Sequence, residues 1–182
     1  DPRYTSVLVL TDKEETGSDG NTGLCSSYLQ YFIADLAAAF GQEARTVLSH
    51  SRCLSADVNA AFDPTFPDVL DPRNAAFLNY GVVVTKFTGA RGKSGTSDAS
   101  AEFVATIRNL MDENQIIWQT GELGKVDMGG GGTVALYIAN MDVDTIDVGV
   151  PVMSMHAPME VVAKIDVYMA YKAFLAFISD KT

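Results

Sequence analysis

The sequence predicts an α/β fold in which a largely parallel sheet is flanked by helices. Short runs of apolar and β-branched residues recur along the chain, segments of helical period lie between them, and residues typical of turns separate the two. Strands that alternate with helices are typical of parallel sheets. All 182 residues are expected to belong to a single α/β domain. Because the chain enters a strand-like run almost at once, we expect this domain to be incomplete at its amino end.

The predicted strands are apolar runs bounded by polar or turn-forming residues. A continuous apolar run is typical of a strand that is buried on both faces of a sheet. In chain order these runs are Val7–Leu10, Leu54–Val58, Gly81–Lys86, Ile116–Gln119 and Thr145–Val150.

Helices are predicted where apolar residues recur every three or four positions. The first covers Leu29 to Phe40 and ends at Gly41. The second begins after Asp98, which is a suitable N-cap, and buries Phe103, Ile107 and Leu110. The last covers Glu160–Ile178 and is apolar on most of its sides, so we expect it to be well buried.

The run Gly129–Gly132 admits two interpretations. A glycine-rich loop can hold phosphate groups, but this run lacks the lysine of a phosphate-binding loop, and Thr133 follows directly. The favoured interpretation is a tight turn that allows the backbone to approach a substrate or a neighbouring strand.

Composition excludes several kinds of partner. A net charge of −10 disfavours nucleic acid and anionic membranes. No stretch of about twenty apolar residues is present, so no membrane span is expected. Cys25 and Cys53 show no spacing typical of metal ligands and are expected to be free thiols in a reducing compartment, which places the protein in the cytoplasm.

Polar residues that could carry chemistry lie at or just after the ends of three predicted strands. They are the pair Glu14 and Glu15, then Asp57, and finally His156. Ligands of α/β sheets gather at the carboxyl ends of strands. Three carboxylates and an imidazole can hold zinc or a similar divalent ion, and one carboxylate can serve as a general base. Each residue also has a simpler interpretation, as part of a solvated loop, a turn or a hydrogen-bonded histidine.

Four linked segments resemble the M18 family of aminopeptidases, the group of aspartyl aminopeptidase and aminopeptidase I. Their order and spacing agree with the family over nearly the whole chain. The segments are Asp12-Lys13-Glu14-Glu15-Thr16-Gly17-Ser18, Ser55-Ala56-Asp57 with Pro64, Asp127-Met128 with Gly132-Thr133, and Gly149-Val150-Pro151 with Ser154-Met155-His156-Ala157. The chain resembles the carboxyl-terminal part of the family's catalytic domain.

The resemblance implies a role for individual residues. Glu14 would be the general base, Glu15 and His156 would bind one metal ion, and Asp57 would bind the other. The implied cofactor is zinc, two ions in a complete site, with cobalt or manganese as alternatives. The implied substrates are peptides, and the implied assembly of the full-length protein is a homo-oligomer. The positions that match the family's substrate pocket are Asp127, Lys86 (or Lys93), Gly132 and Thr133.

The resemblance also implies that part of the site is missing from this chain. The family draws a His-x-Asp and a metal-bridging Asp from upstream of the Glu pair, and residues 1–11 contain no counterpart. A separate dimerisation domain, inserted upstream, is absent as well. We therefore expect this chain alone to be inactive. The alternatives are a non-catalytic relative that acts in assembly and, with less support, a nucleotide-binding protein.

Overall fold

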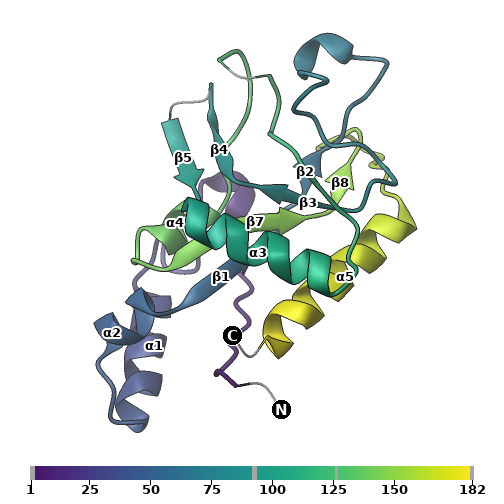
Figure 1. Ribbon diagram of the computed structural model, residues 1–182. Helices are drawn as coiled ribbons and strands as arrows, with labels where there is room; N and C mark the ends of the chain where they lie inside the picture. Colours follow the sequence, from purple (N-terminus) through teal and green to yellow (C-terminus); the bar gives the residue numbers. More distant parts are fainter. Residues whose placement is uncertain (1–2, 92–93, 126, 181–182) are drawn as a thin grey trace.

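A four-stranded sheet forms the centre of the computed structural model, which describes residues 3–91, 94–125 and 127–180 (Figure 1). The strands run in the order β1, β7, β3, β6. The β1–β7 and β3–β6 pairs are parallel, and β7–β3 is antiparallel. These strands are Arg52–Ser55 (β1), Val82–Thr85 (β3), Trp118–Thr120 (β6) and Asp144–Gly149 (β7). The predicted α/β fold with a largely parallel sheet is thus confirmed.

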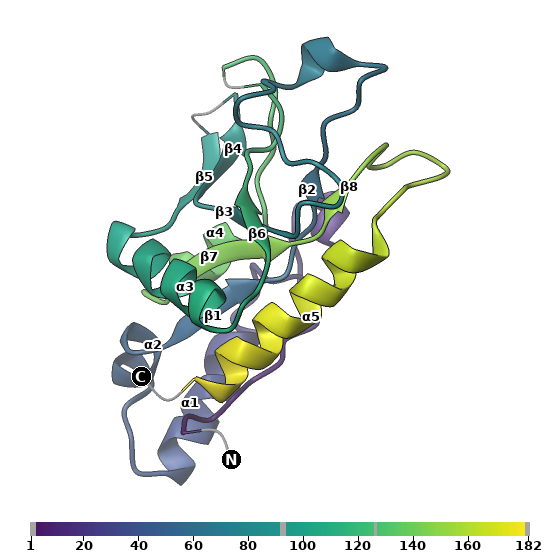
Figure 2. The same ribbon diagram turned by 45° about the vertical axis from the view of Figure 1, so that its right-hand side comes forward.

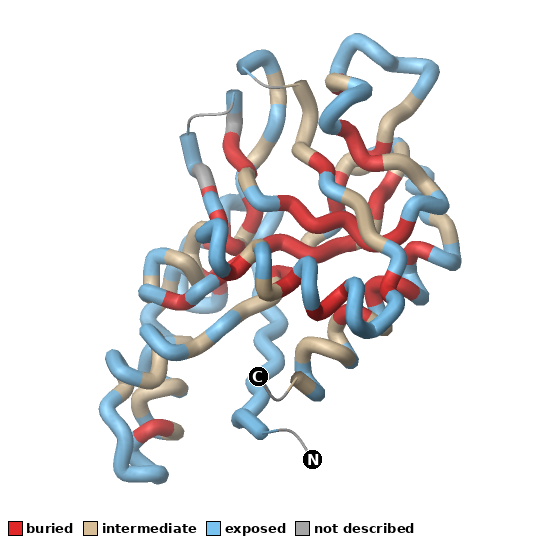
Figure 3. The backbone as a smooth tube through the Cα atoms, in the orientation of Figure 1, coloured by how far each residue is buried: buried red, intermediate tan, exposed pale blue. Residues whose placement is uncertain are grey.

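Two helices cover one face of this sheet, α3 (Ala101–Glu113) and α5 (Lys164–Ser179) (Figures 1 and 2). Successive residues of a strand point to opposite faces, so alternate residues of β3 and β7 face these helices. The resulting core is shown in red in Figure 3. Its members include Val82, Val84, Phe103, Ile107, Leu110, Met111, Ile146, Val148, Met169, Ala170 and Ala173.

The remaining short elements extend or connect the strands of this sheet. A short parallel pair, β2 (Asn59–Ala60) and β8 (Pro151–Val152), continues the paths of β1 and β7. The hairpin of β4 (Phe87–Ala90) and β5 (Ser94–Asp98) follows β3, and the short helix α4 (Ala135–Ala139) precedes β7.

Four further elements lie outside this core. The helices α1 (Tyr28–Ala39) and α2 (Ala44–Ser49) pack against each other at one end of the molecule (Figure 1). Single 3₁₀ turns occur at η1 (Glu14–Thr16) and η2 (Pro67–Val69). Within the described residues, no helix combines the length and apolar character needed to cross a bilayer.

The predicted buried strand at Val7–Leu10 is wrong. These residues form no strand in the structure, and Leu8 and Leu10 are 85% and 87% exposed. Figures 1 and 2 show the segment leaving the sheet and running toward the C-terminal end of α5. The apolar run has strand propensity, but a strand also needs a hydrogen-bonding neighbour, and none of the described residues supplies one.

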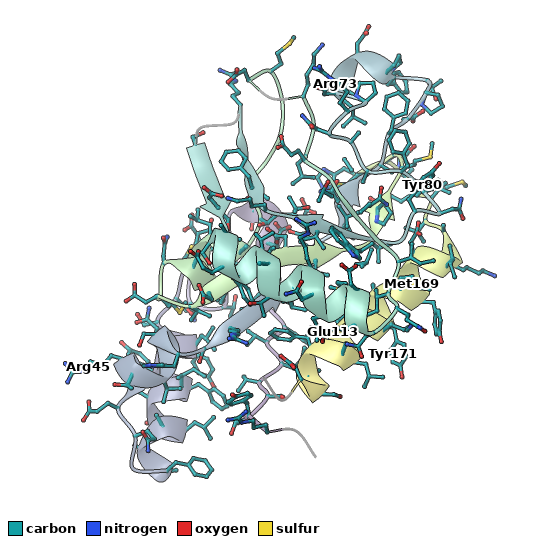
Figure 4. The ribbon with its side chains drawn as sticks, viewed as in Figure 1. Arg45, Arg73, Tyr80, Glu113, Met169 and Tyr171 are labelled. Atoms are coloured by element: carbon teal, nitrogen blue, oxygen red, sulfur yellow. The ribbon has the colours of Figure 1, made fainter. Side chains whose placement is uncertain are left out.

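Two other sequence predictions need correction. Helix α5 is not buried on most sides, because residues such as Tyr171 and Leu175 are more than half exposed while Met169 faces the core (Figure 4). Helix α3 begins at Ala101 and is capped by Ser100, whose hydroxyl accepts from the amide of Phe103. Asp98 belongs to β5 instead, because the Gly- and Ser-rich segment before it forms a hairpin with β4.

Candidate metal and catalytic site

A pocket of ≈ 330 Å³ lies beside the carboxyl ends of β1 and β7. Its walls come from segments that are far apart in the sequence, namely η1, the turn after β1, the loop of residues 123–132 and the loop after β8. The lining residues are Glu14, Glu15, Asp57, Val58, Ala60, Leu123, Gly124, Gly130, Gly131, Gly132, Met155 and His156. All four residues that were predicted for catalysis and metal binding therefore lie around one pocket.

The Glu pair is held by a tight left-handed entry into η1. Lys13 and Gly17 flank the turn with positive φ angles of 63° and 90°. The amides of Gly17 and Ser18 donate to the carbonyl oxygens of Glu14 and Lys13, respectively, at 3.1 Å and 2.8 Å. The turn presents both carboxylates to the pocket in place of the extended strand end that the sequence predicted.

Glu15 and His156 form the closest pair in the site. His156 Nε2 lies 3.2 Å from Glu15 Oε1, although the two residues are 141 positions apart (156 − 15). Two donors that each lie about 2.1 Å from a tetrahedral zinc ion are about 3.4 Å from each other. The spacing of this pair therefore fits two ligands of one zinc ion.

The loop that carries His156 is held in an unusual conformation. His156 itself has a φ of 65°, in the left-handed region that non-glycine residues seldom adopt. Its backbone N–H donates to Glu160 Oε1 at 2.6 Å, which stabilises the turn and brings the imidazole toward Glu15.

Asp57 lies where β7 and the turn after β1 approach each other closely. Its Oδ1 accepts from the amide of Val58 at 2.8 Å. A Cβ added at Gly149 would lie 1.4 Å from the carbonyl oxygen of Asp57, so only glycine allows this approach. Gly149 is thus a steric requirement of the site that the sequence motif contained but did not explain.

The carboxylates of the pocket repel one another. Burial, and then the negative charges of Asp57 and Glu15, raises the pKa of Glu14, while His156 opposes the shift. Burial is also the main cause of the raised pKa of Asp57, to which Glu15 adds. A bound cation would relieve this repulsion, so the electrostatics of the pocket also fit a divalent ion.

The ligand set is nevertheless incomplete among the described residues. No group of three or more His, Cys, Asp or Glu side chains there is arranged closely enough to hold a metal ion. The donor types and the Glu15–His156 spacing fit zinc. Asp57 lines the same pocket but does not complete a set of metal ligands with that pair.

The residues predicted for substrate binding lie at different places. Gly132 lines the pocket, whereas Thr133 is buried and its hydroxyl donates to Asp147 Oδ2 at 2.8 Å. Lys86 is exposed and pairs with Asp98. Asp127 is exposed and has a φ of 65°, beside but not among the lining residues. Lys93 lies outside the described residues.

The glycine run approaches a neighbouring strand, as the favoured interpretation required. Carbonyl oxygens of Gly131 and Gly129 accept from the amides of Gly89 and Arg91 at 2.9 Å and 2.7 Å. A Cβ at Gly130 would lie 2.6 Å from the carbonyl oxygen of Gly89. The glycines therefore let this loop pack edge-on against β4 while Gly130–Gly132 face the pocket.

Comparison with known proteins gives a consistent family assignment. Residues 1–178 match the sequence profile of a family described as "Aminopeptidase I zinc metalloprotease (M18)". A probable M18 family aminopeptidase 1 of Clostridium acetobutylicum is 43% identical over 182 residues, which cover 98% of this chain and 39% of that protein. The chain thus spans about two fifths of the length of this relative.

Solved structures agree with the sequence comparison. The crystal structure of an M18 family aminopeptidase from Thermotoga maritima superposes with a TM-score of 0.89 at 41% identity, covering 94% of this chain and 39% of that one. The S. cerevisiae mApe1 dodecamer superposes with a TM-score of 0.74 at 24% identity over 92% of this chain and 36% of its own, which shows a shared fold.

Proposed function

We propose that this chain, which belongs to the M18 family of zinc metallo-aminopeptidases, forms part of the active site of an enzyme that removes amino-terminal residues from peptides. One observation carries the proposal. Glu14, Glu15, Asp57 and His156, from three distant segments, line the same pocket, and Glu15 and His156 lie at the spacing of two zinc ligands.

In this proposal the residues divide the work. Glu15 and His156 hold one metal ion and Asp57 a second, together with ligands from the rest of the longer protein. Zinc bound in this way supplies a Lewis acid that polarises the scissile carbonyl and increases the acidity of the attacking water. Cobalt or manganese could replace it, because the donor set is of oxygen and nitrogen atoms.

Glu14 acts as the general base. It takes a proton from water as the water oxygen forms a bond to the carbonyl carbon, and it delivers that proton to the amine that leaves when the C–N bond breaks. The raised pKa of Glu14 suits this exchange, because a base is most effective when its pKa is near the working pH.

The free α-amino group of the peptide defines an aminopeptidase substrate. Asp127 is the carboxylate that we propose to pair with this cation. Gly132, which lines the pocket, the adjoining Thr133, and Lys86 are the further candidates for contact with the peptide. The full-length protein is proposed to act as a homo-oligomer in the cytoplasm. The dodecameric assembly of a protein with the same fold supports the oligomer.

The test compares Glu14→Gln with the wild type in the full-length protein supplied with zinc. Loss of the base should lower kcat for amino-terminal cleavage by about 10²–10⁴-fold. The zinc content should be unchanged, because Glu14 is not a ligand. Glu113→Gln on the exposed side of α3 (labelled in Figure 4) is the control and should be fully active.

Two outcomes would contradict the proposal. One is full activity of Glu14→Gln. The other is a wild-type protein that binds zinc but cleaves no peptide, which would favour a non-catalytic role in assembly.

A further inference from the structure

A buried carboxylate lies behind the pocket, and neither the family motif nor the proposed reaction uses it. Asp147, on β7, is 4% exposed. It accepts a hydrogen bond from Thr133, and its other oxygen, Oδ1, has no hydrogen-bond partner among the described residues. Burial raises the pKa of Asp147 to about 6, although the neighbouring hydroxyl groups of Ser55 and Thr133 act in the opposite direction.

The strand register places Asp147 among other buried polar side chains. It is paired with Ser55 across the parallel β1–β7 ladder and with Thr85 across the antiparallel β7–β3 ladder. Side chains of directly paired residues lie on the same face of a sheet. Thr85 in turn accepts from Asn59 Nδ2 at 2.8 Å. This polar cluster (Ser55, Asn59, Thr85, Thr133 and Asp147) lies on the face opposite the α3–α5 core.

Two neighbours of Asp147, and its own strand, lead directly into walls of the pocket. Ser55 ends β1 two residues before Asp57. Thr133 follows Gly132, which lines the pocket. Further along β7 itself, Gly149 packs against the Asp57 carbonyl oxygen, and the chain then continues through β8 to His156.

Stability alone is a poor explanation for a carboxylate in this position. For a buried charge that keeps only one hydrogen bond, the free energy lost on leaving water exceeds the free energy that the bond contributes. The bond nevertheless joins the glycine loop directly to the central strand. Its geometry therefore fixes the distance of the loop from the sheet.

We propose that Asp147 is a positioning residue, which through its hydrogen bond with Thr133 holds the glycine loop (residues 129–133) against the sheet and so sets the wall on which the peptide substrate binds. The inference rests on the proposed peptidase function, which it extends. Asp147 and the Thr133 hydroxyl themselves do not touch the substrate in this arrangement.

Two backbone hydrogen bonds report the position of this loop independently of catalysis. The amides of Gly89 and Arg91 donate to the carbonyl oxygens of Gly131 and Gly129. Their hydrogen exchange should accelerate if the loop leaves its position, because these bonds must then open.

The experiment uses the full-length protein with Thr133→Val, Thr133→Ser, Asp147→Asn and, as a control, Thr106→Val. Valine keeps the shape of threonine but removes the donor, and serine keeps the donor. Thr106 is an exposed residue of α3 whose hydroxyl donates to the carbonyl oxygen of Glu102, away from the pocket. Hydrogen exchange of β4 and steady-state kinetics are measured well below the unfolding temperature of every variant.

For Thr133→Val we expect about fivefold faster exchange in β4 and a KM about fivefold higher, the factor for one lost hydrogen bond, with a much smaller change in kcat. Thr133→Ser and Asp147→Asn, which keep a donor and an acceptor, should show clearly smaller effects. Thr106→Val should match the wild type.

The proposal is overturned if Thr133→Val leaves exchange in β4 unchanged, if the loop moves without any change in KM, or if Thr133→Ser is as impaired as Thr133→Val. Failure of the underlying function would look different. A wild-type protein that cleaves no peptide would refute the proposed peptidase, and exchange in β4 would still decide whether Thr133 and Asp147 position the loop.

Discussion

At the scale of single residues, carboxylates have different roles in this molecule. Glu14 and Asp57 are carboxylates at a pocket, where mutual repulsion and burial raise the pKa of each and favour a cation. Asp147 is a carboxylate behind that pocket, with a hydrogen bond from Thr133 and almost no exposure to solvent. The surroundings of each carboxylate, and not its identity, therefore decide what it does.

The raised pKa of Asp147 predicts a pH dependence of stability. The pKa is about 6 in the folded chain against 3.8 for an ordinary aspartate, so between these values the folded state holds more protons than the unfolded state. The free energy of unfolding therefore falls as pH rises from about 4 to about 6. Asp147→Asn removes this loss and should be more stable than the wild type at pH 7 by about 1–3 kcal/mol.

Urea unfolding of both proteins at pH 4 and pH 7 checks this prediction. The advantage of Asp147→Asn should shrink toward zero at pH 4, because the aspartate is then protonated in the folded state. Asp144→Asn, an exposed position at the start of the same strand, is the matched control. An advantage that is equal at both pH values would refute the assigned cause.

At the scale of elements, the spacing of apolar residues along the sequence correctly predicted the helices and strands of the core. The apolar run at β3 is buried at every position, and α3 buries Phe103, Ile107 and Leu110 as predicted. The β4–β5 hairpin was missed because its glycines and serines have low strand propensity. Its cross-strand bonds, together with those from the glycine loop, supply the stabilisation that propensity lacks.

A single buried carboxylate fixes α5 to the sheet. Asp166, in the first turn of α5, is fully buried, and its two oxygens accept from the amides of Asn79 and Gly81 at 2.8 Å each. Both of these residues have positive φ angles in the turn that leads into β3. The contact joins the helix, the turn and the sheet.

Replacement of this residue by alanine should be costly. Asp166→Ala leaves two backbone N–H groups without their acceptors, and we expect a loss of about 2–5 kcal/mol in the free energy of unfolding. Asp35→Ala, at an exposed position of α1, should change it by less than about 0.5 kcal/mol. Equal midpoints of thermal unfolding for the two variants would contradict this role.

At the scale of the whole molecule, exposed apolar surface occurs together with an incomplete set of metal ligands. Large apolar residues are exposed on α1, α5 and the segment before η1, shown in pale blue and tan in Figure 3. The pocket has carboxylates and a histidine, yet the described residues do not form a group of three metal donors. The chain spans about two fifths of the length of its relative from C. acetobutylicum (39%).

The proposed active site therefore predicts a difference between this chain and the longer protein. The 182-residue chain alone should bind zinc at least about tenfold more weakly, because fewer ligands share the ion, and should show no measurable aminopeptidase activity. Zinc titration and peptide hydrolysis of both proteins under the same conditions provide the check. Cleavage by the isolated chain at the rate of the longer protein would exclude the idea that the site is shared with other segments.

The sequence by itself determined the fold class, the strands and helices of the core, the family, and four of the residues that line the pocket. It could do so because the spacing of apolar residues and the linked motifs are local patterns, which can be recognised without knowing the tertiary contacts. Its prediction for Val7–Leu10 failed, since a strand exists only with a partner, and no local pattern contains the partner.

Only the tertiary structure decided how these parts meet. It brought Glu15 and His156 to 3.2 Å, it turned Thr133 away from the pocket toward Asp147, and it required glycine at position 149. The physical reason is that distances between segments far apart in the chain depend on strand register and packing. The sequence therefore predicted which residues could form the site, and the register of β1, β3 and β7 determined which of them face it.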